Sequence, residues 1–204
     1  TIGTISGVNN YISGINIDAS YIVISGFEII NPTYSGIKIS SGNNIIKNNI
    51  ITSNNNIGTG IGGNVDSGSV EIYNNTINGP KYGLALGNFY GSSIVENNIV
   101  TNCSYGLYET SLYATTRIID YNDVYGSSIK DYSVGILPIG GHNISYDPQY
   151  NNADASDFSL KSTSLAIDSG TVISGVTKDI LGNSRPQGNG YDMGAYESSF
   201  TNPG

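Results

Sequence analysis

The chain has 204 residues, of which 12% are charged, and eight Lys and Arg against sixteen Asp and Glu give it a net charge of −8. A negative surface repels phosphate backbones, so this balance argues against a nucleic-acid partner. No segment approaches the roughly 20 apolar residues that span a membrane. Cys103 is the only cysteine, which excludes a disulfide within the chain. The 27 Gly and 16 Tyr favour an all-β protein with many turns.

A short phrase built on paired asparagines recurs along residues 24–125 at intervals of 22–26 residues. An interval of this length with a fixed internal pattern predicts a solenoid. Two columns of β-branched aliphatic residues flank the phrase, as expected for strands that bury one face. These columns are Ile24, Ile46, Ile72, Val95, Ile119 and Ile29, Ile51, Ile77, Val100, Val124.

The phrase itself contributes two more columns. They are Gly26, Asn48, Asn74, Asn97, Tyr121 and Phe27, Asn49, Asn75, Asn98, Asn122. Because Gly and Asn adopt positive φ more readily than other residues, the first column predicts a left-handed bend, which Tyr121 fits least well. We expect the second column to point inward, with Asn side chains hydrogen-bonded from rung to rung across the spacing of about 4.8 Å between strands.

A second pattern, a Gly followed by an aliphatic residue, repeats with the same interval at Gly14, Gly36, Gly60, Gly83 and Gly106. Each rung is therefore expected to contain a strand before the Asn bend, a short strand after it, a variable loop and a third strand that begins at the Gly. Parallel strands connected in this way coil into a right-handed, three-sided parallel β-helix (a β-solenoid), here of about six rungs of 22–26 residues.

The interval and the Asn ladder both stop after Gly126, and the rest of the chain is richer in Asp. We expect one domain, with residues 1–126 as β-helix rungs and residues 127–204 as the last irregular rungs and an irregular C-terminal cap. Asp168, Asp179 and Asp192 lie beside turns and are expected to bind the local backbone, with Arg185 as partner of one of them. Residues 1–5 read as the middle of a rung, which predicts a longer parent chain or another surface stacked on this end.

The repeats at 46–51 (IKNNII) and 95–100 (VENNIV) resemble those of the pectate-lyase-like superfamily of parallel β-helices. The end of the chain is similar to the closing segment of bacterial and archaeal surface β-helix proteins. The segments that carry this similarity are 147–150, 157–160, 164–170, 179–186 and 192–197. The resemblance implies the fold and an extracellular, cell-surface location. It fixes no activity, because such proteins include lyases, hydrolases, epimerases, adhesins and inert spacers.

For a lyase, the resemblance implies a Lys or Arg base beside Ca²⁺ that is held by Asp or Glu, on the strands that follow the variable loop. Lys38 is the only candidate base in the outward column of these strands. Asp66 and Glu109 are the nearest candidate ligands, although Glu109 falls on an expected inward position. Glu96 and Asp120 share another outward column, where they either bind Ca²⁺ or extend into water as ordinary surface carboxylates.

Tyrosines mark the same strands. Tyr82 and Tyr105 precede the repeat Gly on successive rungs, Tyr34 lies two residues before Gly36, and Tyr108 points outward. Tyr rings stack on sugars and add a hydroxyl for hydrogen bonding, but a row of Tyr can also simply cover a corner of the solenoid. The carbohydrate-binding candidates are Tyr34, Lys38, Tyr82, Tyr105 and Tyr108.

These patterns predict an extracellular, cell-surface-associated β-helix module that contacts polysaccharide or a cell-surface glycan and is non-catalytic as it stands. Two alternatives stay open. One is a structural stalk or filament subunit that assembles with copies of itself, or with an upstream domain, through its uncapped N-terminal rung. The other is a Ca²⁺-dependent polysaccharide lyase that uses Lys38 as its base.

Overall fold

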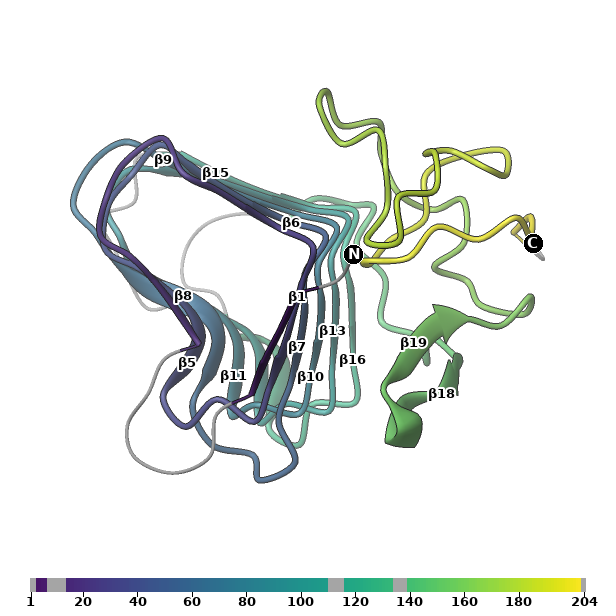
Figure 1. Cartoon of the computed structure of the whole chain (residues 1–204), viewed down its shortest axis with the longest axis horizontal. Coiled ribbons are helices and arrows are strands. Elements are labelled where there is room, and N and C mark those ends of the chain that lie inside the picture. The colour runs from purple at the N-terminus through teal and green to yellow at the C-terminus, as the bar shows by residue number, and fades with distance from the viewer. Residues whose placement is uncertain (1–2, 7–13, 110–115, 134–138, 203–204) are drawn as a thin grey trace.

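A computed structural model describes residues 3–6, 14–109, 116–133 and 139–202. Three parallel sheets run along a solenoid, and one antiparallel pair of strands lies beside it (Figure 1). Sheet A contains β1 (Gly3–Ser6), β4 (Phe27–Ile30), β7 (Ile50–Thr52), β10 (Thr76–Asn78), β13 (Ile99–Thr101) and β16 (Asp123–Tyr125). Sheet B contains β2 (Ile15–Ile17), β5 (Ser35–Ile39), β8 (Thr59–Val65), β11 (Tyr82–Phe89), β14 (Tyr105–Tyr108) and β17 (Lys130–Ser133). Sheet C contains β3 (Val23–Ser25), β6 (Asn44–Lys47), β9 (Ser69–Tyr73), β12 (Ser92–Glu96) and β15 (Arg117–Asp120).

Each rung visits sheets C, A and B in turn, so residues one interval apart become neighbours in the same sheet. Ile29 pairs with Ile51 and Ile51 with Ile77 in sheet A, and Ile37 pairs with Ile61 in sheet B. All five members of the second aliphatic column are fully buried. The predicted all-β, three-sided solenoid is confirmed.

The repeat Gly is required where sheets A and B meet. A Cβ on Gly36 would lie 2.6 Å from Cγ2 of Ile51 and 2.6 Å from the carbonyl oxygen of Gly60. Side chains at this position would therefore collide with the core, which explains why the pattern keeps a Gly on every rung.

The predicted bend is present on all five rungs. Its φ angles are 81° at Gly26, 52° at Asn48, 50° at Asn74, 59° at Asn97 and 55° at Tyr121. Tyr121, the least regular member of the column in the sequence, thus adopts the same left-handed conformation as the Asn residues. The position in the repeat sets the conformation here more strongly than the residue's own preference.

The second Asn column forms the expected internal ladder. Each Nδ2 donates to Oδ1 of the Asn on the next rung, at 3.0 Å for Asn49 to Asn75, 3.0 Å for Asn75 to Asn98 and 2.9 Å for Asn98 to Asn122. Asn122 in turn donates to Oδ1 of Asn143 at 3.0 Å. The expectation that the ladder stops at Asn122 is therefore wrong, because it continues onto one further rung.

That further rung is irregular. β17 pairs with β14, Gly140 donates to the carbonyl of Ile119, and Ile144 forms a parallel bridge with Asp123. Asp123 is fully buried under this crossing chain, and its Oδ1 accepts a hydrogen bond from the backbone N–H of Tyr146 at 3.1 Å. Burial raises the pKa of Asp123 to about 7.

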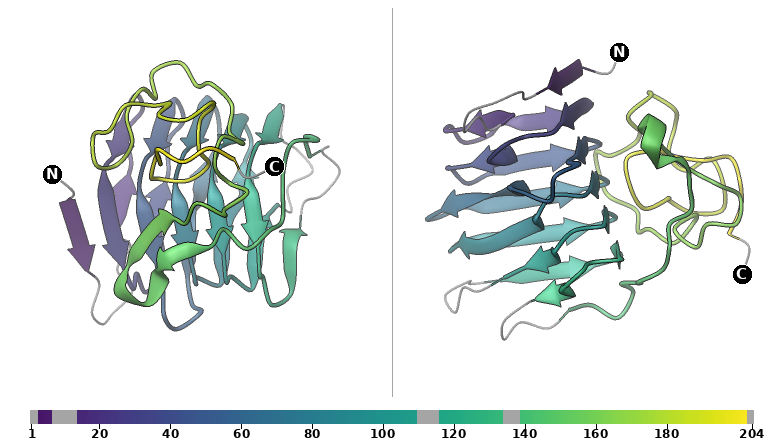
Figure 2. Two further views of the ribbon diagram at one scale, coloured as in Figure 1. Left: turned by 90° about the vertical axis from the view of Figure 1, so that its right-hand side faces the viewer. Right: turned by 90° about the horizontal axis from the view of Figure 1, so that it is seen from below.

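Residues 145–202, which we call the tail, lie along the side of the solenoid rather than across its end (Figures 1 and 2). The tail contains β18 (Tyr150–Asn152), the short 3₁₀ helix η1 (Ala153–Ala155) and β19 (Asp157–Leu160). Its apolar side chains pack on Ile50 and Ile99, which point outward from sheet A. The predicted C-terminal cap is not confirmed as a cover for the last rung.

The bend column fastens the tail to the solenoid. Nδ2 of Asn48 donates to the carbonyl of Lys178 at 2.8 Å, and Nδ2 of Asn97 donates to the carbonyl of Thr171 at 2.7 Å. Between them, Nδ2 of Asn74 donates to the carbonyl of Asp192 at 3.0 Å. The two asparagines of each pair therefore have different roles. The first forms the bend and binds the tail, and the second hydrogen-bonds neighbouring rungs inside the solenoid.

Within the tail, carboxylates organise the turns. Asp179 and Asp168 each accept backbone N–H groups with both oxygens, and Asp192 accepts those of Asp168 and Ser198, as the sequence predicts. Arg185 differs from its prediction, since it pairs with Glu197, not with one of these Asp residues, at 2.5 Å and with both side chains fully buried.

Candidate functional site

The outer face of sheet B carries a hollow of about 450 Å³, on the side of the solenoid away from the tail (Figure 1). We call it the tyrosine hollow. Its lining includes Tyr34, Lys38, Gly62, Asn64, Tyr82, Ala85 and Tyr108. The two smallest of these, Gly62 and Ala85, are strand neighbours in the outward column, between Lys38 and Tyr108. Small residues in the middle of a column flanked by long side chains produce the depression.

Three tyrosines form one cluster at the Tyr108 end of the hollow. The rings of Tyr82 and Tyr105 stack with centroids 5.4 Å apart and an interplanar angle of 14°. Tyr108 lies 4.7 Å from Tyr82 and 5.2 Å from Tyr105, tilted to both. All three remain partly exposed, so the cluster presents aromatic surface to solvent as well as covering the sheet. Lys81 adds a cation 5.2 Å from the centroid of Tyr82.

The repeat register therefore brings the predicted carbohydrate-binding residues together. Tyr34, Lys38, Tyr82 and Tyr108 line the same hollow, and Tyr105 stacks behind Tyr82 at its edge. Tyr34 is 57% exposed and stands on the loop before β5. Sequence reasoning missed Lys81 and Asn64. Lys81 could have been found, because it directly precedes Tyr82, a predicted carbohydrate-binding residue.

Lys38 is half-buried in this lining, and no carboxylate accompanies it there. A lysine acts as a general base when burial, a neighbouring group or a metal ion lowers its pKa, or when a metal ion activates the acid that it deprotonates. The described lining of the hollow therefore contains Lys38 and no acidic side chain.

Asp66 and Glu109, the candidate metal ligands nearest to Lys38 in the repeat, lie in different environments. Asp66 is exposed on the turn after β8, beside a separate shallow depression with Asn43 and Tyr90. Glu109 is inside the core, as its position in the repeat predicts, and forms an ion pair of 2.5 Å with buried Arg117. Across the residues that the structure describes, no group of three or more His, Cys, Asp or Glu is arranged to hold a metal ion.

Glu96 and Asp120 are neighbours on the outer face of sheet C. Burial, followed by the charge of Asp120, raises the pKa of Glu96. For Asp120 burial alone would raise the pKa, but hydrogen bonds from His142 and Tyr121 lower it overall. His142 lies 2.9 Å from Asp120 Oδ2 through Nδ1, and its ring stacks on Tyr121 with centroids 4.4 Å apart. This His–Asp contact spans 22 residues, one repeat interval, but the residue pattern stops after Gly126 and did not indicate it.

A family model described as a right-handed β-helix region matches residues 4–158 of the chain. Comparison with curated protein sequences found no match. The described residues form no helix with the length and hydrophobicity needed to span a membrane.

Proposed function

The chain belongs to the right-handed β-helix family, and on this scaffold we propose that it binds polysaccharide through the tyrosine hollow of sheet B. The observation that carries the proposal is the partly exposed cluster of Tyr82, Tyr105 and Tyr108 beside a floor of Gly62 and Ala85. Aromatic rings combine apolar contact area with a polar edge, which matches the mixed apolar and hydroxylated faces of a sugar.

The direction of the hollow favours a chain-like ligand. Lys38 and Tyr108 occupy the same outward column three strands apart, a span of about 14 Å along the solenoid axis. A glycan laid parallel to the axis would contact the Tyr cluster at one end and Lys38 at the other. Because no carboxylate lines the hollow, Lys38 also accommodates an acidic sugar on a protein that carries a net charge of −8.

We propose that this contact is a binding function at a cell surface rather than catalysis. An eliminating lyase needs a base and a charge-stabilising group within a few ångströms of each other, and the lining supplies Lys38 without an acidic or metal-binding neighbour. The cell-surface location rests on the resemblance of the repeats and of the closing segment to surface β-helix proteins.

Glycan binding tests the proposal directly. A panel of neutral and uronate oligosaccharides is titrated into the chain by calorimetry, and Tyr108→Ala is expected to weaken the best ligand by about tenfold, the equivalent of roughly 1.4 kcal/mol. Tyr21→Asn is the matched control, because Tyr21 is 81% exposed, lies outside the hollow and has φ 64°, which Asn tolerates. Equal loss in both variants, or no binding by the unaltered chain, would reject the proposal.

The same oligosaccharides separate binding from cleavage. Uronate polymers incubated with the chain and Ca²⁺ are expected to give no rise in ultraviolet absorbance from unsaturated product. A rise that disappears in Lys38→Ala would restore the lyase alternative.

A further inference from the structure

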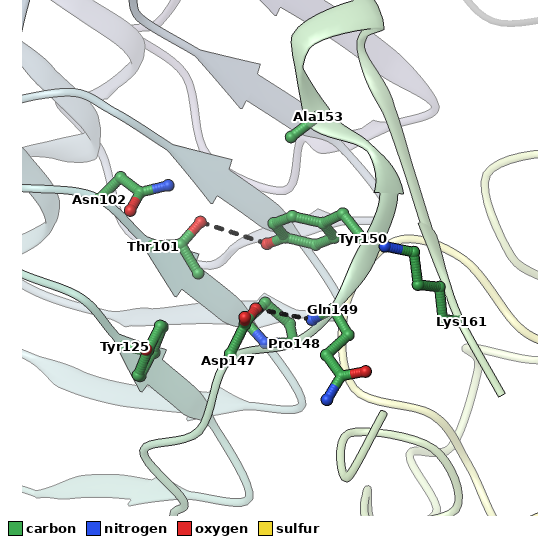
Figure 3. A pocket seen from close by; sticks show the side chains of 9 residues that line it. All are labelled: Thr101, Asn102, Tyr125, Asp147, Pro148, Gln149, Tyr150, Ala153 and Lys161. Atoms are coloured by element: carbon green, nitrogen blue, oxygen red, sulfur yellow. Dashed lines mark hydrogen bonds between the residues drawn. The ribbon is translucent and has the colours of Figure 1, made fainter. Parts of the chain in front are cut away.

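A second hollow lies where the tail crosses the solenoid, on sheet A rather than sheet B (Figure 3). Its volume is about 460 Å³, within the range of about 300–1,000 Å³ that small-molecule sites occupy. We call it the seam hollow. Its lining includes Asn102, Tyr125, Asp147, Gln149, Tyr150 and Lys161. Asn102 and Tyr125 follow or end strands of the solenoid, and the other four come from the tail, so neither part forms the hollow alone.

The tail wall of the seam hollow is held in place by its own contacts. The hydroxyl of Tyr150 lies 3.3 Å from Oγ1 of Thr101, and its ring packs edge-on against Phe158 with centroids 5.0 Å apart. Gln149 has φ 53°, and its backbone N–H donates to Oδ1 of Asp147 at 2.9 Å. The backbone of Lys161 donates to the carbonyl of Gln149 at 3.0 Å. A wall fixed in this way is preorganised for a ligand.

Several polar groups of this hollow are left for a ligand. Within the described chain, Oδ2 of Asp147, Nε2 of Gln149, Nζ of Lys161 and the hydroxyl of Tyr125 have no hydrogen-bond or ion-pair partner. Figure 3 shows Tyr125 and Asn102 on one side of the hollow and Asp147, Gln149 and Tyr150 on the other. The hollow thus offers both donors and acceptors around the exposed ring of Tyr125.

We propose that the seam hollow binds a neutral sugar unit. One carboxylate and one ammonium give the lining no net charge, so an ionic ligand of either sign would meet a like charge as well as a partner. A sugar hydroxyl both donates and accepts, and therefore suits Asp147, Gln149 and Lys161 together, while its apolar face lies on Tyr125. This surface shares no lining residue with the tyrosine hollow of sheet B.

Two sites on different faces would give the chain two glycan contacts at once. Binding one polymer at sheet B and another at the seam would cross-link them. Where both sites hold the same polymer, the second contact is intramolecular and the combined strength exceeds that of either site. The seam site also gives the tail a role in recognition in addition to its packing on the rungs.

Nuclear magnetic resonance of the ¹⁵N-labelled chain tests the seam site without reference to sheet B. Neutral gluco-, manno- and xylo-oligosaccharides are added, and the side-chain amide signals of Asn102 and Gln149 are followed. At least one of these sugars is expected to shift both signals in a saturable way. Tyr125→Ala should weaken that saturation by about tenfold, and Tyr108→Ala should leave it unchanged.

The matched control is Tyr146→Ala, because Tyr146 is 55% exposed and does not line the seam hollow. Failure of both amides to shift with every sugar, or shifts that Tyr125→Ala does not weaken, would overturn the inference. Shifts that respond to Tyr125 but not to Tyr108 would uphold it even if the tyrosine hollow binds nothing, so the two proposals can fail separately.

Discussion

The rungs and the tail are stabilised by different kinds of contact. In the rungs, backbone ladders and columns of like side chains repeat the same contact between neighbours, as in other solenoids. The tail has one short strand pair, and its turns depend on a few buried charged groups such as Asp179, Asp192 and Arg185. Repetition spreads stability over many small contacts, whereas the tail concentrates it in single side chains.

The largest expected effect is therefore in the tail. Arg185 pairs with Glu197 and donates to the carbonyls of Asp192 and Gly194, all inside the fold. Arg185→Leu leaves the Glu197 carboxylate buried without its partner, and we expect a loss of about 3–5 kcal/mol of stability. Limited proteolysis should cut the tail while circular dichroism retains the β-sheet signal of the rungs.

Lys178→Leu serves as the control for Arg185→Leu, because Lys178 is an exposed tail cation whose side chain has no partner among the described residues. It should change stability by less than about 0.5 kcal/mol. Simultaneous unfolding of rungs and tail in Arg185→Leu would show that the two regions are one cooperative unit.

The next effect is in the rungs. Asn75 accepts from Asn49 and donates to Asn98 and to the carbonyls of Ile46 and Tyr73. Asn75→Ala removes these buried hydrogen bonds and the acceptor of the Asn49 backbone N–H, although Asn49 Nδ2 and Asn98 Oδ1 keep other partners. We expect a loss of about 1–3 kcal/mol, seen as a lower melting temperature. An unchanged melting temperature would mean that the ladder adds nothing to stability.

Repetition also explains how much could be predicted. The aliphatic columns, the bend and the internal ladder follow from spacing alone, because every rung places equivalent residues in the same environment. The register likewise placed Tyr34, Lys38, Tyr82 and Tyr108 on one face, where they line one hollow. Even Tyr121 could be assigned to the bend from its position, against its own preference.

What could not be predicted lacks this repetition. Asn143 lies only 21 residues after Asn122 and has no Asn before it, so it did not match the phrase. The tail pairs with rungs up to 130 residues away, as in the contact of Asn48 with Lys178, and no spacing encodes such a distance. The seam hollow depends on the same long-range packing, and for that reason the sequence did not indicate it.

At the junction of the rungs and the tail, we expect the substitution Asp123→Asn to increase stability. Burial raises the pKa of Asp123 from 3.8 in the unfolded chain to about 7 in the folded chain. Between pH 4 and pH 7 the carboxyl is therefore protonated in the folded chain and ionised in the unfolded chain. Stability is therefore lost as pH rises from about 4 to 7. Asp123→Asn keeps the acceptor for Tyr146, removes the buried charge and should stabilise the protein by about 1–2 kcal/mol at pH 8.

The check on Asp123→Asn is urea unfolding at pH 4 and pH 8. The difference between variant and unaltered chain should be present at pH 8 and small at pH 4, where the folded carboxyl is protonated and the unfolded one is close to its pKa of 3.8. Equal differences at the two pH values would assign the effect to the added amide and not to the charge.

The smallest effect tests the contact between rungs and tail. Asn74 donates to the carbonyls of Asp192 and Gly194, but both carbonyls also accept from Arg185 and stay paired without Asn74. Asn74→Gly keeps the φ of 50° and should loosen the tail by only about 1 kcal/mol. Hydrogen exchange should become about fivefold faster at the Gly194 amide and stay unchanged at the Asn98 amide of the inner ladder.

Asn56→Gly, at φ 50° on an exposed turn, is the control for the added flexibility of Gly. If both amides exchange faster in Asn74→Gly, the bend asparagines stabilise the rungs as well as the tail. The two Asn columns would then not have separate roles.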